Sequence, residues 1–87
     1  MNKNIRKFTC SSPLFSGFNC YINLDYCNSI NDIIDIFKNE LLSILNLHNF
    51  EVLIEKVKQS RFHIHDNTFE SILLSDKNKI IYICENC

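Results

Sequence analysis

The spacing of apolar residues along the chain changes from alternation to helical spacing and back. In residues 19–26, Cys20, Ile22 and Leu24 share one side of the chain and more polar residues occupy the other, as in a half-buried strand. From residue 28 to residue 47, apolar residues recur every three or four positions, with polar residues between them. This spacing predicts an amphipathic helix that packs one side against a flat surface.

Cap and turn residues divide the rest of the chain into short elements. Ser29 is suited to cap the helix, and Asp32 follows three residues later, at capping-box spacing. The only Pro and the only Gly fall within residues 11–18, which predicts a loop or a wide hairpin turn. The other predicted elements are strands at 4–10, 50–58, 61–66 and 80–84, a short helical turn at 67–74 capped by Asn67 or Thr68, and a polar turn at 75–79.

The order of these elements, β-β-α-β-β-β, predicts one α+β domain over residues 1–87. A hairpin followed by a crossover helix requires a mixed sheet, here of four to five strands, with the amphipathic helix on one face. The run at 80–84 is the most apolar, so we expect this strand in the middle of the sheet, beside the first strand.

Composition excludes several classes of protein. The chain is 46% hydrophobic and 22% charged with a net charge of -1, as in a small globular domain with one modest core. Its nine Lys and Arg are scattered, so we expect no nucleic-acid partner. We also expect no membrane span and no secretory signal, because no apolar run is long enough or correctly placed. Five cysteines without a signal then indicate a reducing, cytoplasmic setting and thiols that act as small apolar residues.

The C-terminal segment NTFESILLSDKNKIIYIC resembles the ubiquitin-like superfamily in its spacing. Thr68 and Phe69 fall where the ubiquitin pattern has a Thr-Leu pair, Leu74 falls where it has a buried Ile, and residues 80–84 match its last strand. The segment INLDYCNSINDII resembles the entry into its helix. The resemblance implies a β-grasp fold and a non-catalytic protein-interaction module, or a small subunit of a larger assembly. No Gly follows Gly17, so we do not expect conjugation through a Gly-Gly tail.

The same resemblance implies a partner-binding sheet face. In a gapless match, Ile80 and Tyr82 point to the core, and Ile81 and Ile83 point outward. Leu53, or Val52 with Ile54, would lie beside them on the neighbouring strand. Leu53, Ile81 and Ile83 are therefore the predicted partner-binding residues, since contiguous exposed apolar surface usually marks an interface. A shift by one residue exchanges the two sets and makes Ile81 and Ile83 core residues. The sequence does not name the protein partner, and we expect a monomer or a weak homodimer.

A second interpretation assigns a zinc site to His63, His65, Cys84 and Cys87. Alternate residues of a strand share a face, so both imidazoles can point the same way, and Cys-x-x-Cys supplies two thiolates. Two His and two Cys form a standard structural zinc set. The alternative is that both His are solvated on an exposed strand and the chain has no cofactor.

An enzyme is not expected. The chain has no glycine-rich phosphate loop and no paired-carboxylate motif. His65 and Asp66 are adjacent in a predicted strand and so point to opposite faces, which does not suit a catalytic pair. The Cys-x-x-Cys follows a strand, whereas a redox pair needs a helix N-terminus to lower the thiol pKa.

Overall fold

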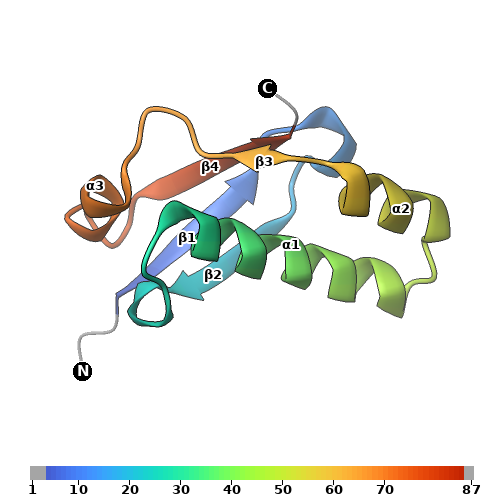
Figure 1. Ribbon diagram of the computed structural model, residues 1–87, viewed down its shortest axis with the longest axis horizontal. Helices are drawn as coiled ribbons and strands as arrows, with labels where there is room; N and C mark the ends of the chain where they lie inside the picture. Colours follow the sequence, from blue (N-terminus) through green and yellow to red (C-terminus); the bar gives the residue numbers. More distant parts are fainter. Residues whose placement is uncertain (1–3, 86–87) are drawn as a thin grey trace.

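A four-stranded mixed sheet and a long helix organise the computed structural model, which describes residues 4–85 (Figure 1). The helices and strands are β1 (Ile5–Cys10), β2 (Asn19–Asn23), α1 (Ile30–Leu47), α2 (Glu51–Gln59), β3 (Phe62–His63), α3 (Phe69–Leu73) and β4 (Ile80–Glu85). Two short 3-10 helices, Pro13–Phe15 and Leu24–Tyr26, follow β1 and β2. The predicted α+β class is confirmed.

The sheet has the strand order β2-β1-β4-β3. β1 pairs antiparallel with β2 and parallel with β4, and β4 pairs antiparallel with β3. The prediction that the last strand lies inside the sheet, beside the first strand, is therefore confirmed. The predicted loop at 11–18 joins the hairpin, and Gly17 has a φ of 89°, a conformation that favours glycine.

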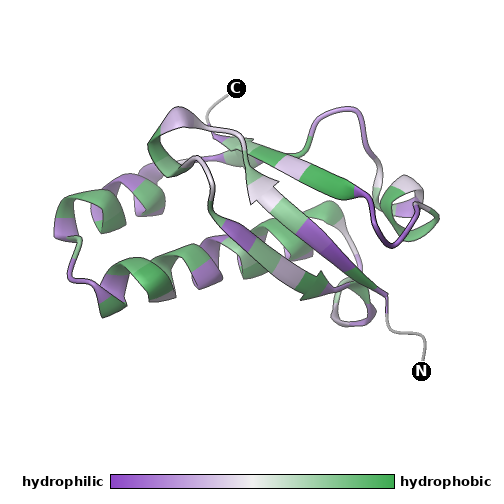
Figure 2. Cartoon of the chain, turned by 180° about the vertical axis from the view of Figure 1, so that it is seen from behind, coloured by the Kyte–Doolittle hydropathy of each residue, from purple (hydrophilic) through white to green (hydrophobic). Residues whose placement is uncertain are grey.

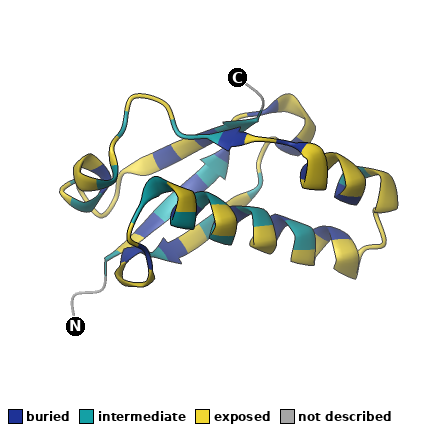
Figure 3. Cartoon of the chain, viewed as in Figure 1, coloured by how far each residue is buried: buried dark blue, intermediate teal, exposed yellow. Residues whose placement is uncertain are grey.

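Helix α1 begins and packs as its sequence predicts. The Ser29 hydroxyl accepts a hydrogen bond from the Asp32 backbone N–H at 3.4 Å, and the Asp32 carboxylate accepts one from the Asn28 N–H at 2.7 Å. The buried residues of α1 recur every four positions and are Ile33, Phe37, Leu41 and Leu45. Figure 3 shows buried and exposed positions alternating along this helix. Each such side chain contributes about 1.5–3 kcal/mol when fully buried. None of the described helices has the length and hydropathy that a membrane span needs.

The predicted strand at 50–58 is wrong, because residues Glu51–Gln59 form helix α2. Its buried residues, Ile54 and Val57, are three apart and so lie on one helical side. Glu51 in the first turn and Lys56 in the last turn also complement the helix dipole. The β-branched residues had favoured a strand, but helical burial against α1 decides the conformation. Leu53 is therefore a half-buried helix residue, and it does not belong to the sheet.

The predicted orientation of the last strand is also wrong. Ile81 and Ile83 are 1% and 0% exposed, so they are core residues. Their partners across the parallel pair explain this: Phe8 faces Ile81 and Cys10 faces Ile83, and both partners are buried. Paired residues of neighbouring strands point to the same face, so β1 fixes the register of β4. The alternative register, with Ile81 and Ile83 inside, is the one that the chain adopts.

The segment between α2 and β4 contains less strand than predicted. Of residues 61–66, only Phe62 and His63 form a strand, and Asp66 turns the chain with a φ of 58°. The helical turn within 67–74 is confirmed as α3. Thr68 caps it in a capping box with Ser71, whose backbone N–H donates to the Thr68 hydroxyl at 3.1 Å.

Candidate functional site

One face of the sheet is the strongest candidate for a functional site. Helix α1 covers the other face, and from behind the strands lie in front of the helix (Figure 2). The side chains that alternate with the core residues point away from α1. The large apolar and aromatic ones among them are Ile5, Tyr21, Ile80 and Tyr82, which are 36%, 70%, 40% and 60% exposed. These four residues, together with Lys7, are called the outer-face patch below.

Strand register places the members of the outer-face patch side by side. Lys7 of β1 lies between two neighbours, with Tyr21 of β2 on one side and Ile80 of β4 on the other. In the next row, Thr9 pairs with Tyr82. Side chains of directly paired antiparallel residues lie about 4.5–5.5 Å apart at Cβ, so Lys7 and Tyr21 cover adjoining surface. The patch therefore spans the three strands β2, β1 and β4.

The outer-face patch carries little charge. Among the outward positions of the described strands, Lys7 is the only residue with a full formal charge. Glu85 points the other way, where its carboxylate accepts hydrogen bonds from the hydroxyls of Ser12 and Ser60. The patch is therefore apolar and aromatic with one central cation.

A hollow of about 370 Å³ adjoins the patch at β4. It lies between the strand and the loop that follows β3, and Asp66 lines it in its left-handed conformation. The Asn67 side-chain amide donates to the His65 carbonyl oxygen at 2.9 Å and holds this loop in place. The other residues that line the hollow are Ser11, His65, Lys79, Ile80, Ile81, Tyr82 and Cys84. The patch is thus continuous with a concave surface.

The structure brings three of the four predicted zinc ligands to one end of the sheet. His63 is directly opposite Cys84 in the antiparallel β3–β4 pair. The imidazole of His65 stacks on that of His63, with ring centroids 6.1 Å apart. Within residues 4–85, no group of three His, Cys, Asp or Glu is positioned to hold a metal ion. Cys87 lies outside the described residues, so the four-ligand site stays a prediction.

The buried thiols do not support nucleophilic chemistry. Burial raises the pKa of Cys20 to about 12, and the carboxylate of Glu40 adds to this effect. Burial also raises the pKa of Cys10 and of Cys27. The thiolate is the reactive form, so these three residues remain protonated and inert near neutral pH. This agrees with the prediction that they act as small apolar residues.

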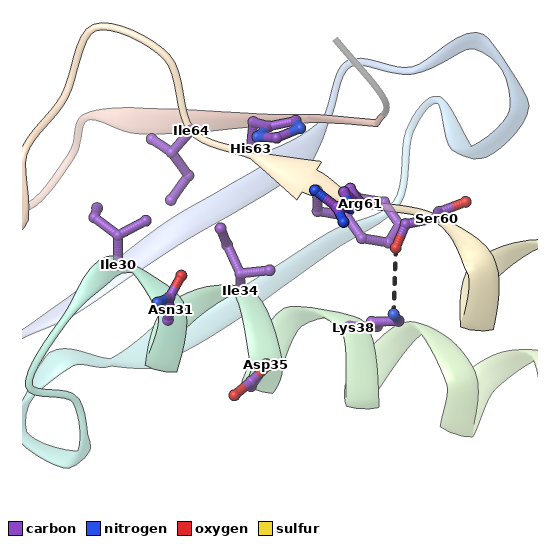
Figure 4. Close-up of a pocket in the computed structure, with 10 residues that line it drawn as sticks. Ile30, Asn31, Ile34, Asp35, Lys38, Ser60, Arg61, His63 and Ile64 are labelled. Carbon is purple, nitrogen blue, oxygen red and sulfur yellow. Dashed lines mark hydrogen bonds between the residues drawn. The ribbon is translucent and has the colours of Figure 1, made fainter.

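A second concave region lies between α1 and β3 (Figure 4). It has a volume of about 590 Å³ and is called the α1–β3 groove. Its lining residues are Ile30, Asn31, Ile34, Asp35, Lys38, Ser60, Arg61, Phe62, His63 and Ile64. The Lys38 ammonium closes one end by donating to the carbonyl oxygens of Lys58 and Ser60, each at 3.3 Å.

The sequence missed Ile80 and Tyr82 as outward residues because strand periodicity gives two registers and does not choose between them. The tyrosine at position 82 could have indicated which of the two registers is correct. A buried tyrosine hydroxyl needs a hydrogen-bond partner, whereas an outward tyrosine reaches water. Tyr21 was correctly placed opposite Cys20 and Ile22 from the alternation of its own strand.

Comparisons with protein-family models, with curated proteins and with solved structures find no match to this chain. Its function is therefore inferred from its own residues.

Proposed function

We propose that this protein is a non-catalytic, ubiquitin-like interaction module that binds a protein partner through the outer-face patch. The strand order supports the β-grasp part of the proposal. A β1–β2 hairpin leads into a helix, and the last strand then pairs parallel to β1 in the middle of a mixed sheet. This is the topology that the resemblance to the ubiquitin-like superfamily implies.

The single observation that carries the proposal is the exposure of Tyr21, Ile80 and Tyr82 on one uncovered sheet face. Isolated exposed apolar residues need no explanation, but here three large side chains lie on adjoining strands. Tyrosine is enriched at protein interfaces because it offers apolar area and a hydrogen-bonding hydroxyl. A nucleic-acid partner fits less well, since Lys7 is the only full charge on the face and nucleic-acid binding needs several cations.

The proposal predicts that Ile80→Asp and Tyr82→Asp lose partner binding and keep the fold. Both side chains are exposed, so a carboxylate at either position stays in water. Proteins captured from a cell extract by the wild-type chain are compared with those captured by each variant. Val52→Asp is the matched control, because Val52 is 72% exposed on α2, away from the sheet. Partners that the two face variants retain, or that only Val52→Asp loses, would contradict the proposal.

A second candidate function is zinc binding, which the cross-strand pair of His63 and Cys84 favours. In this proposal these residues, with His65 and Cys87, join the end of the chain to β3. A native mass spectrum of the reduced, full-length protein is expected to show one zinc ion that a chelator removes. Cys84→Ser should lose the ion, whereas His48→Asn, at the far end of α1, should keep it. A metal-free mass for the wild-type chain after incubation with zinc would exclude this function.

A further inference from the structure

One wall of the α1–β3 groove is formed by β3 and the residues next to it in the chain. Five consecutive residues, 60–64, line it from the β3 side. Alternate side chains of an extended chain point to opposite faces. That consecutive residues line the groove therefore indicates that the edge of this segment, and not one of its faces, borders it. β3 is the last strand in the sheet order, and among the described residues it pairs only with β4. Its other edge therefore faces the groove.

The opposite wall is a single stripe of helix α1. The residues that line it, Ile30, Asn31, Ile34, Asp35 and Lys38, follow helical spacing. From residue 30 to residue 38 a helix rises about 12 Å. From residue 60 to residue 64 an extended chain spans about 13 Å. The two walls have similar length, so the groove accommodates about four residues of a strand that runs beside β3.

The interior of the groove is aliphatic and its end is cationic. Ile30 and Ile34 point from α1 toward β3, and Ile64 points back toward them (Figure 4). Lys38 lies at the end where α2 leads into β3, and Arg61, the residue before β3, also lines the groove. Among residues 4–85, the only acidic residue that lines the groove is Asp35, which lies at its outer rim. This arrangement complements a ligand with aliphatic side chains and a carboxylate.

We propose that the α1–β3 groove binds an extended segment of a partner protein, which adds to the sheet at the edge of β3. Strand addition supplies backbone hydrogen bonds, and pockets for alternate side chains give specificity. The segment places aliphatic side chains on Ile30, Ile34 and Ile64, and its Asp or Glu pairs with Lys38 at the end of the groove. This site is separate from the outer-face patch, and it does not depend on the function proposed for that patch.

The test is a display selection of random short peptides against the full chain. We expect enriched peptides with alternating aliphatic residues followed by Asp or Glu. Their binding should shift the backbone amide signals of residues 61–64 in the NMR spectrum of the isotope-labelled protein. A peptide N-methylated at alternate residues should lose binding, because it has lost the donors that strand addition uses.

Two matched pairs of variants test the charge complement. Lys38→Glu should weaken binding about tenfold or more, as expected for loss of a charged hydrogen bond, whereas Lys77→Glu, in the exposed turn before β4, should not. Asp35→Asn should strengthen binding roughly two- to fivefold, and Glu40→Asn, exposed on α1 outside the groove, should leave it unchanged. Because Asp35→Asn is expected to gain affinity, misfolding of this variant cannot produce the same result.

Several results would overturn the proposal. They are the absence of any enriched peptide, amide shifts confined to the outer-face patch, and equal binding of the N-methylated peptide. Equal effects of Lys38→Glu and Lys77→Glu would also overturn it. Self-association of the chain through the β3 edge, seen as a dimer that Lys38→Glu dissociates, would replace the proposed partner with a second copy.

Discussion

At the scale of single residues, Arg6 of β1 shows how one side chain holds α3 and the turn before β4 in place. Its side chain is only 2% exposed, yet it carries a charge. The guanidinium donates to the carbonyl oxygens of Leu73 and Ser75, each at 3.0 Å, and to the Ser75 hydroxyl at 3.1 Å. These acceptors lie at and just beyond the C-terminal end of α3, where helix carbonyls lack partners within the helix. Arg6 thus fastens α3 and the turn that leads into β4 to the first strand.

Arg6→Met is therefore expected to destabilise the protein by about 2–4 kcal/mol, since it leaves several part-buried acceptors without this donor. The stability of Arg6→Lys should fall between that of Arg6→Met and that of the wild type, because an ammonium keeps the charge but lacks the planar fork of the guanidinium. Urea unfolding followed by circular dichroism measures both. An Arg6→Met variant as stable as the wild type would show that water satisfies these carbonyls equally well.

At the scale of elements, helix α1 and the hairpin strands were predictable because one periodicity dominates each of them. Ser29, Asp32 and the four-residue spacing of buried side chains all agree on the same helix. The helical conformation of Glu51–Gln59 was not predictable, because its β-branched residues favour a strand while the spacing of Ile54 and Val57 also matches a helix. Only packing against α1 decides between them, and that packing depends on residues distant in sequence.

Which side chains of β4 point to solvent is likewise decided by strand pairing. Its own sequence, Ile80–Glu85, is apolar at nearly every position, so alternation within it carries little information. The pairing of Phe8 with Ile81 and of Cys10 with Ile83 supplies the missing constraint. The predicted binding face was therefore wrong in its residues, although the strand itself and its central place were predicted correctly.

At the scale of the whole molecule, the chain presents two different surfaces on one sheet. The outer-face patch is apolar and aromatic and lies over β2, β1 and β4, whereas the α1–β3 groove follows the edge of β3 that, within residues 4–85, pairs with no other strand. A domain with both could engage a folded surface and an extended segment at once. Linking two such contacts raises the overall affinity without new interactions at either site.

The measurement that tests this arrangement most directly compares Ile81→Asp with Tyr82→Asp by urea unfolding. These neighbours on β4 are 1% and 60% exposed. Tyr82→Asp should change the free energy of unfolding by no more than about 1 kcal/mol, as for most exposed sites. Ile81→Asp should unfold the protein, because it buries a carboxylate without a partner. A stable Ile81→Asp beside an unfolded Tyr82→Asp would place Tyr82 in the core and contradict the outer-face patch.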